Sequence, residues 1–370
     1  MKTKILFYID TLNGGGAEKV LRTLVNSMDQ TKFDITVQTT FQEKAKDFLC
    51  NGITYKYCFK KQNAVTDALF RIEAALGLVY SLHIKGDYDV EVAYLECGPT
   101  KIISSSTNKK AKKFAWVHCD LRKKSDEPEV FAEKSKPWYE KFDKIVCVSE
   151  NVRKGFTELY GNSHDSVVIY NTIDDKEIIE KSLAPLPKEI VKKKLTLLMV
   201  GRLMPQKNYP RLLKTVKTLL DEGFDFDLWI LGEGEDRQKL ENYIRDNNLT
   251  ENIKLLGFQN NPYPFIKSAD LLVCSSNYEG FSTFVAEGLV LGKTVVTTDC
   301  SGMDELLGNN EYGIITDNND EAFLNGLRQM LSDTDSLNSY TEKAKHRGQQ
   351  FSKQILTEQT QNLFFETLDM

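Results

Sequence analysis

Histidine and proline are scarce in this chain of 370 residues, with four and nine copies, and no long apolar run occurs. No segment approaches the roughly 18 consecutive apolar residues of a membrane span, and the run at residues 5–9 is too short for a signal-peptide core. The seven cysteines are odd in number and form no C-x-x-C pair, which indicates reduced thiols rather than a disulfide framework. We therefore expect a cytoplasmic protein that contacts at most the inner face of the cell membrane.

A strong net charge is also missing from this sequence. The formal charge of −5 provides no counterion release on binding a polyanion, so nucleic acid is disfavoured as a partner. Residues 1–190 carry 29 Lys and Arg against 27 Asp and Glu, whereas the remaining residues carry 19 against 26. This asymmetry indicates two domains with different partners.

Many basic side chains of the first half lie in one short stretch. They are Lys109, Lys110, Lys112, Lys113, Arg122, Lys123 and Lys124. Such a stretch suits the anionic headgroups of a membrane, at about 1 kcal/mol per charge near the surface. It equally suits a solvated rim that makes no contact. A peripheral contact with an anionic membrane is a hypothesis at this point.

Short apolar runs rich in β-branched and aromatic residues recur between helical patterns. Because these runs are continuous rather than alternating, they predict strands covered on both faces, as in the parallel sheets of doubly wound α/β domains. The predicted strands are 5–9, 35–41, 53–58, 90–95, 114–118, 145–149 and 167–170 in the first half, and 195–200, 226–231, 253–258, 271–275, 295–298 and 312–315 in the second. Two sheets of about six strands each follow from this pattern.

The most proline-dense segment, residues 184–188, lies at the midpoint of the chain and is followed by a lysine run and a new strand. Such a segment is typical of a linker between domains. The predicted parts are an N-terminal Rossmann-like domain over 1–183, a linker over 184–194, a second Rossmann-like domain over 195–350, and a C-terminal helix over 351–370 that packs back on the N-terminal domain.

Ligands of open α/β sheets bind beyond the carboxyl ends of the strands, so the turns at these ends are the first candidates for a binding site. The first strand leads into a glycine-rich turn at residues 14–16, where Gly15 and Gly16 allow a backbone to approach a phosphate or sugar closely. A dinucleotide fingerprint would need a third glycine where Lys19 stands. A tight turn between a strand and a helix explains the same residues without a ligand.

A second turn of this kind opens the second half of the chain. Arg202 emerges at a strand end, and Lys207 directly precedes a helix whose start is marked by Asn208 as the cap and Pro210 in the first turn. A planar guanidinium and a compact ammonium beside one loop are suited to gripping a diphosphate. Each cation alone would more often be an ordinary surface charge.

The segment 275–288 combines acceptors and donors after a buried strand. Ser282 is placed to cap a helix, and the first N–H groups of that helix favour an anion. Glu279 lies in the loop and Glu287 lies about one turn inside the helix, so both carboxylates could accept hydrogen bonds from hydroxyl groups. Donors for phosphate and acceptors for diols are what a sugar nucleotide needs, although an ordinary capped helix with two solvated acids has the same spacing.

With these segments in view, the chain resembles the retaining glycosyltransferases of family four, whose GT-B fold has two Rossmann-like domains facing a cleft. The matching segments are 14–18, 201–208, 231–234, and the pair Glu279 and Glu287, which corresponds to the family's motif of two glutamates separated by seven residues. They occur in the family's order and span nearly the whole length. The sequence departs from the family pattern at Ser282-Thr283, where Gly-Leu is frequent.

The resemblance implies a nucleotide-diphosphate sugar bound mostly by the second domain. Arg202 and Lys207 would neutralise the diphosphate, and Glu287 would accept from the ribose hydroxyls. Glu279 would contact the hydroxyls of the transferred sugar, and His118, which ends a strand, would lie near that sugar. The implied catalytic residues are thus His118, Glu279, Arg202 and Lys207, and the implied donor-binding residues are Gly15, Gly16, Arg202, Lys207, Gly257, Phe258, Glu279, Gly280, Phe281, Ser282, Thr283 and Glu287.

Cleavage of the anomeric bond places new negative charge on the diphosphate, which fixed cations and N–H dipoles would stabilise. Because Arg202 and Lys207 can fill this role, no metal and no other cofactor is expected. The strings Asp87-Tyr88-Asp89 and Asp225-Phe226-Asp227 precede strands rather than follow them, so they do not read as metal sites. The resemblance further implies a retaining transfer, with a UDP-sugar favoured as the donor and a glycan or a lipid-linked molecule as the acceptor, in bacterial-type surface polysaccharide or glycoconjugate synthesis.

Other functions stay open on the sequence. An epimerase or hydrolase of the same fold would use the same donor without an acceptor, and a non-catalytic nucleotide-sugar sensor would bind the donor without turnover. A dehydrogenase is the weakest alternative, because the dinucleotide fingerprint is incomplete.

Overall fold

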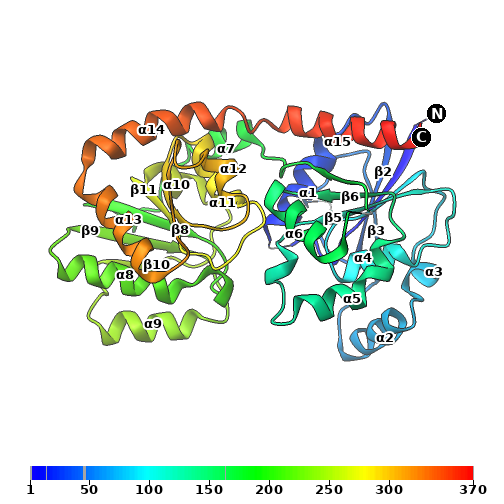
Figure 1. The fold of residues 1–370 in the computed structure, drawn as a ribbon, viewed down its shortest axis with the longest axis horizontal. Coiled ribbons are helices and arrows are strands. Elements are labelled where there is room, and N and C mark those ends of the chain that lie inside the picture. The colour runs from blue at the N-terminus through cyan, green and yellow to red at the C-terminus, as the bar shows by residue number, and fades with distance from the viewer. Residues whose placement is uncertain (1, 14, 45–46, 163, 370) are drawn as a thin grey trace. The chain divides into compact units, whose positions relative to one another are not determined.

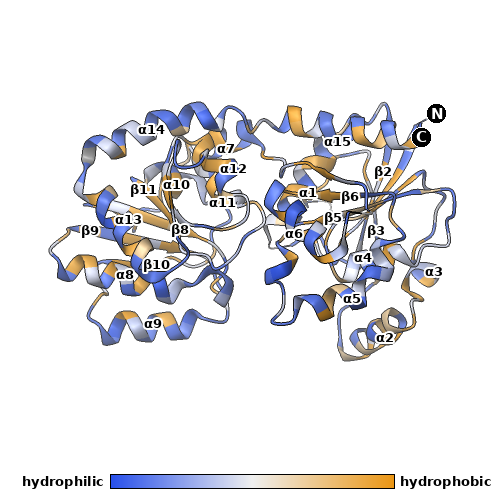
Figure 2. Cartoon of the chain, in the orientation of Figure 1, coloured by the Kyte–Doolittle hydropathy of each residue, from blue (hydrophilic) through white to orange (hydrophobic). Residues whose placement is uncertain are grey.

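The computed structural model describes residues 2–13, 15–44, 47–162 and 164–369, which form two α/β units (Figure 1). Unit 1 comprises Met1–Thr172 and Lys353–Met370, and unit 2 comprises Ile173–Ser352. Each unit has its own parallel sheet with helices on both faces, so the predicted class of two Rossmann-like α/β domains is confirmed. Figure 2 shows that the strands carry apolar residues, while polar residues are frequent on the covering helices.

The sheet of unit 1 has seven parallel strands in the described part of the chain, in the order β3-β2-β1-β4-β5-β6-β7. Their bounds are β1 Thr3–Tyr8, β2 Phe33–Phe41, β3 Thr54–Phe59, β4 Val90–Ala93, β5 Lys112–Val117, β6 Lys144–Cys147 and β7 Ser166–Val168. Ile5 lies beside Ile35 of β2 and Val90 of β4, and all three are buried. Every run predicted as a strand in this half overlaps an observed one.

The helices of unit 1 cover both faces of this sheet (Figure 1). They are α1 Gly16–Ser27, α2 Ala64–Ala75, α3 Val79–His83, α4 Gly98–Ser104, α5 Pro128–Tyr139, α6 Glu150–Tyr160 and α15 Lys353–Leu368, with a short 3₁₀ turn η2 at Leu121–Lys123. The last helix, α15, packs on strands formed much earlier in the chain: the ring of Phe364 lies 6.1 Å from Phe7 and 4.9 Å from Phe114, and Phe365 stacks on Phe33 at 4.9 Å.

The sheet of unit 2 has six parallel strands among the described residues, in the order β10-β9-β8-β11-β12-β13. Their bounds are β8 Leu195–Val200, β9 Phe226–Leu231, β10 Ile253–Leu255, β11 Leu271–Cys274, β12 Thr294–Thr298 and β13 Ile314–Thr316. The helices are α7 Asp175–Lys181, α8 Tyr209–Asp221, α9 Arg237–Asp246, α10 Tyr263–Ser268, α11 Thr283–Val290, α12 Met303–Leu307, α13 Asp320–Ser332 and α14 Thr334–Gly348, with a 3₁₀ turn η3 at Pro205–Lys207.

The division between the units falls at Thr172 and Ile173, earlier in the chain than the predicted linker at 184–194. The reason is that α7 packs against α10 and α11 of unit 2. Its last carbonyl, that of Lys181, accepts a hydrogen bond from Asn261 Nδ2 at 2.9 Å. The proline-rich segment therefore lies inside unit 2, after its first helix.

Each sheet reverses its winding direction at one pair of neighbouring strands. In unit 1 this switch point lies between β1 and β4, and in unit 2 it lies between β8 and β11. The loops that leave the two strands at such a point diverge to opposite faces, which opens a crevice at the carboxyl edge where ligands of this fold class bind. Most of the predicted site residues follow these strands, whereas His118 follows β5, and Gly257 and Phe258 follow β10.

Candidate functional site

Glycines bring the loops after β8 and β9 into backbone contact in unit 2. A Cβ on Gly232 would lie 1.9 Å from the carbonyl oxygen of Gly201, and a Cβ on Gly234 would lie 2.2 Å from that of Leu203. The N–H of Leu203 in turn donates to the carbonyl of Glu233 at 3.0 Å. The loop that carries Arg202 is therefore held by its neighbour, and side chains are excluded from the contact.

Replacement of Gly232 by alanine is expected to displace the loop that carries Arg202 and to destabilise unit 2 by about 3 kcal/mol or more, because the new Cβ would overlap a backbone carbonyl. Gly223→Ala is the matched control. Its φ of +93° is also in the region that favours glycine, but no atom lies within 4 Å of the new Cβ. Thermal unfolding of the two variants separates overlap from backbone strain; an equal loss of stability in both would contradict the close approach.

The loop after β11 is bonded to the turn that precedes α8. The Gln206 side-chain amide donates to the carbonyl of Tyr278 at 3.0 Å, and the Asn208 amide donates to Asn277 Oδ1 at 2.9 Å. Asn208 also caps α8 through Arg211 N–H, as the sequence predicts, and has a φ of +46°. These bonds fix the loops on the two sides of the switch point relative to each other.

Lys207 and Glu279 form an ion pair across this switch point. Lys207 Nζ lies 2.6 Å from Glu279 Oε1, which also accepts a hydrogen bond from Ser276 Oγ at 2.6 Å. Both side chains are largely buried, with 16% and 8% of their surfaces exposed. Burial disfavours the charged amine, but attraction by Glu279 and the hydrogen bond to it outweigh burial, so the pKa of Lys207 is raised. The amine is held charged where a phosphate could meet it.

Helix α11 begins directly beside this ion pair. Ser282 caps it by accepting the N–H of Val285, which confirms the predicted cap. The predicted residues Gly280 and Phe281 are buried in the loop before the cap, and Thr283 is the first helical residue. Glu287 lies inside the helix and is buried. Its contact with a ribose stays a prediction.

The remaining predicted residues of unit 2 lie on adjacent loops at the same sheet edge. Arg202 follows β8 and is exposed. Gly257 follows β10, has a φ of +70°, and accepts a hydrogen bond from Gly232 N–H at 2.8 Å. The Phe258 side chain next to it is 64% exposed. An exposed aromatic ring at this edge is available to stack on a planar base.

In unit 1, the buried carboxylate of Glu96, which follows β4, is hydrogen-bonded to residues that follow β5. Glu96 accepts hydrogen bonds from His118 N–H at 3.0 Å, from Cys119 Sγ at 3.1 Å and from Lys124 Nζ at 2.9 Å. Burial opposes the charge of Glu96, but Lys124 and His118 outweigh it and hold its pKa at about 2. The carboxylate therefore stays ionised and fixes the backbone of His118.

The imidazole of His118 is enclosed but makes no hydrogen bond with the described residues through either ring nitrogen. Its ring lies 4.9 Å from that of Tyr94. Burial lowers the pKa of His118 to about 4, against an opposing attraction from Glu96. The ring is thus neutral at pH 7, with one N–H donor and one acceptor that are not paired with any described residue.

In the predicted glycine-rich turn after β1, Gly14 lies outside the described residues, whereas Gly15 and Gly16 are described. Gly15 caps α1 and Gly16 is its first residue. Asp10, which follows β1, approaches α4: a Cβ on Gly98 would lie 3.1 Å from Asp10 Oδ2. Burial raises the pKa of Asp10 to about 6. A joint role of Gly15, Gly16 and His118 with the loops of unit 2 stays a prediction.

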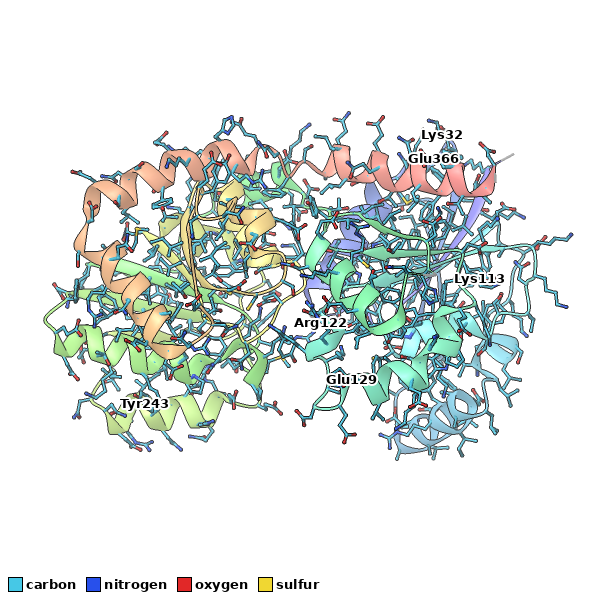
Figure 3. All side chains as sticks on the ribbon, viewed as in Figure 1. Lys32, Lys113, Arg122, Glu129, Tyr243 and Glu366 are labelled. Carbon is cyan, nitrogen blue, oxygen red and sulfur yellow. The ribbon has the colours of Figure 1, made fainter. Side chains whose placement is uncertain are left out.

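The basic stretch at 109–124 does not form one patch. Lys109 and Lys110 precede β5, Lys112 and Lys113 are its first two residues, and Arg122, Lys123 and Lys124 follow its end. The six residues of β5 span about 20 Å, and Figure 3 shows Lys113 and Arg122 well apart. Arg122 is also bonded to Asp120 and Glu158, at 2.6 Å each. The interpretation of this stretch as a single membrane-facing cluster is therefore not supported by its geometry.

Several residues that organise the sites were not predicted from the sequence. Glu96 stands between a buried strand and Gly98-Pro99, and this position of an acid was a usable signal. Ser276 and Asn318 left no comparable signal. The Asn318 side-chain amide donates to the carbonyls of Ser276 and Asn277, at 3.2 and 3.0 Å, and so supports the loop of Glu279 from the bend that follows β13.

Among the described residues, no group of three or more His, Cys, Asp or Glu side chains is arranged to hold a metal ion. Within the same residues, none of the helices has the length and apolar character that a membrane span requires.

Comparison with known proteins places this site in context. Residues 180–347 match the family model described as "Glycosyl transferases group 1", and this range contains the loops of Arg202, Lys207 and Glu279. The matched segment lies entirely within unit 2. Likenesses to individual proteins extend the comparison.

The chain is 37% identical over 188 residues to N-acetylgalactosamine-N,N'-diacetylbacillosaminyl-diphospho-undecaprenol 4-alpha-N-acetylgalactosaminyltransferase of Campylobacter jejuni. This match covers 50% of each of the two chains. It is 29% identical over 203 residues to UDP-Gal:alpha-D-GlcNAc-diphosphoundecaprenol alpha-1,3-galactosyltransferase of Escherichia coli, covering 52% of this chain and 49% of that protein. The chain thus spans about half the length of these curated relatives in the matches.

Among solved structures, HepE of Anabaena in complex with UDP and glucose has a similar fold, with a TM-score of 0.77 at 16% identity over 98% of this chain and 100% of that one. This likeness extends the shared fold from unit 2 to unit 1. The family match thus lies in unit 2, and the likeness of fold includes both units.

Proposed function

We propose that the protein is a retaining glycosyltransferase that moves a sugar from a nucleotide-diphosphate sugar to a glycan or lipid-linked acceptor. The observation that carries this proposal is the buried Lys207–Glu279 ion pair at the switch point of unit 2. It lies inside the segment that matches the group 1 glycosyl transferases. The likenesses described above do not favour an epimerase, a hydrolase or a non-catalytic sensor.

The two residues of the ion pair can recognise two different parts of the donor, the diphosphate and the transferred sugar. A diphosphate that enters this edge competes with Glu279 for the ammonium of Lys207, and Arg202 on the same loop adds a second cation. Once its oxygen is released from Lys207, the Glu279 carboxylate can accept hydrogen bonds from the hydroxyls of the transferred sugar. Ser276 holds the carboxylate in place during this exchange.

The same charges favour bond cleavage. As the anomeric bond breaks, negative charge grows on the diphosphate, and the cations together with the N–H groups at the start of α11 stabilise it in place. In a retaining transfer by front-face attack, the leaving phosphate oxygen accepts the proton of the acceptor hydroxyl. His118, which is neutral, would hydrogen-bond to the donor sugar rather than act as a charged acid.

The names of two relatives support the finer choices of substrate. The relative from Escherichia coli is named for UDP-Gal and for a diphosphoundecaprenol acceptor, and the relative from Campylobacter jejuni is named for a diphospho-undecaprenol acceptor. We therefore propose a UDP-sugar as the donor and a lipid-linked or glycan acceptor in bacterial-type surface polysaccharide or glycoconjugate synthesis.

A donor panel tests this proposal. The protein is melted in the presence of UDP-, GDP- and ADP-sugars, and the expected result is a stabilisation of about 2.7 kcal/mol for the true donor at 100 times its dissociation constant. The donor that stabilises is then incubated with lipid-linked and glycan acceptors, and the anomeric configuration of the product is read by NMR. Release of free sugar at an equal rate with and without acceptor would contradict a transferase.

Removal of divalent metal should leave transfer unchanged, because Arg202 and Lys207 are proposed to neutralise the diphosphate. The measurement is the initial rate of transfer with EDTA and with added Mg²⁺ or Mn²⁺. A rate that falls about tenfold or more with EDTA and returns with one metal would assign the phosphate charge to that ion instead.

A further inference from the structure

The outward face of α2 is apolar, which reverses the usual arrangement of a surface helix. Val65, Leu69, Ile72 and Leu76 follow one another at helical spacing and share one face. Their side chains are 76%, 44%, 57% and 66% exposed. An apolar stripe of this spacing normally faces the core of a protein, but here it faces away from it.

The inward face of α2 is anchored, so the stripe cannot turn inward. Phe70 packs edge-on against Phe59 and Phe41, with ring centroids 6.2 and 6.3 Å apart. On the same side, Glu73 is buried and its Oε2 lies 2.7 Å from Nε2 of His83. A capping box at Asn63 fixes the start of the helix.

The apolar surface continues beyond α2. Leu78, in the turn after the helix, is 42% exposed, and Leu82 on α3 is 50% exposed. Both helices lie at the outer margin of unit 1 in Figure 1. Six large apolar side chains on one hairpin of helices are more than the scattered exposed leucines of an ordinary surface. We call these six residues the α2–α3 face.

The charges around the α2–α3 face have one sign. Between Phe59 and Gly86, the exposed charged side chains are Lys60, Lys61, Arg71 and Lys85. The two acids of the same segment are Asp67, which is half-buried and accepts a hydrogen bond from Gln62, and the buried Glu73. The first exposed acid beyond this stretch is Asp87. The face therefore has a cationic rim.

We propose that the α2–α3 face docks on an anionic phospholipid bilayer. Interfacial helices lie in the membrane plane with their apolar face about 5–10 Å into the headgroup boundary, and cations at their rim attract anionic lipid. A second copy of the chain fits the surface less well, because a two-fold contact through this face would bring the two cationic rims together. The proposal rests on this face alone and does not depend on the proposed transfer reaction.

Flotation of the full chain with vesicles tests this docking. We expect the wild type to float with vesicles of phosphatidylcholine and phosphatidylglycerol, and the variant Leu69→Glu/Ile72→Glu to lose at least about tenfold in the bound fraction. Ile355→Glu is the matched control, because Ile355 is also 50% exposed but lies on α15; it should float like the wild type. Unchanged melting temperatures show that the variants are folded.

The rim is tested separately. Lys60→Glu/Lys61→Glu should lose roughly tenfold in binding to the anionic vesicles, and wild-type binding to vesicles of phosphatidylcholine alone should be weaker. The proposal is overturned if the wild type does not float, if Leu69→Glu/Ile72→Glu floats unchanged, or if light scattering shows a dimer that this variant dissociates in the absence of vesicle binding. The assay contains no sugar donor, so its outcome is independent of transfer activity.

Discussion

Lys207→Met is expected to lower kcat by about 10²- to 10³-fold, because it removes the cation that is held where the diphosphate would gain charge. Loss of the ammonium also leaves the carboxylate of Glu279 buried, with Ser276 as its one remaining hydrogen-bond partner among the described residues. Such an uncompensated charge costs about 3 kcal/mol of unfolding free energy. The measurements are the initial rate of sugar transfer at saturating donor and thermal unfolding in the absence of ligand.

The double variant Lys207→Met/Glu279→Gln separates the two effects. Without either charge, stability should return to within about 1 kcal/mol of the wild type, whereas transfer should stay lost. Arg328→Met is the control in the same unit: Arg328 pairs with Glu222 at 2.6 Å on the surface, and such a pair contributes about 0–1 kcal/mol. Recovery of activity in the double variant would show that the ion pair serves folding alone.

His118→Phe is expected to abolish most transfer while leaving stability at pH 7 unchanged or slightly higher. Because neither ring nitrogen is hydrogen-bonded to a described residue, a phenyl ring of similar shape removes two buried polar atoms and leaves no described group without a former hydrogen-bond partner. A structural histidine would show the opposite result, with a loss of stability and little loss of activity. His346→Gln, at an exposed position on α14, is the control and should change neither quantity.

The pH dependence of the His118→Phe variant gives a second readout. The pKa of His118 is lowered to about 4 in the folded chain from about 6.5 when unfolded, so between these values the unfolded state binds more protons. Acid therefore destabilises the wild type through this group, and the variant should gain about 2–3 kcal/mol over the wild type as the pH falls from 6.5 to 4. Asp10 also titrates here, but in both proteins, so it cancels in the difference. A pH-independent difference would contradict the buried neutral ring.

The strands could be predicted from the sequence because parallel strands buried on both faces leave continuous apolar runs. The caps at Asn208 and Ser282 could be predicted for a similar reason, since each satisfies N–H groups within three residues. The ion pair of Lys207 and Glu279 could not be predicted as a pair. The two residues are 72 positions apart, and only the adjacency of β8 and β11 brings them together.

Two features of the chain show that a local pattern does not by itself place side chains in space. Lys113 and Arg122 are close in sequence, but an extended strand between their positions separates them in space. The stripe of α2 has the spacing of a core-facing helix, yet Phe70 on the other side makes the anchoring contacts. Periodicity identifies a face of a helix but does not determine which face meets the sheet.

The packing of α15 on unit 1 has a consequence for the order in which the chain completes its folding. The ring of Phe364 packs among those of Phe7, Phe114 and Trp116, which come much earlier in the chain. During synthesis, the part of the unit 1 sheet that α15 covers therefore stays open while all of unit 2 is made, and unit 2 can finish first although it begins later. A nascent chain would expose these rings to chaperones until residues 353–368 leave the ribosome.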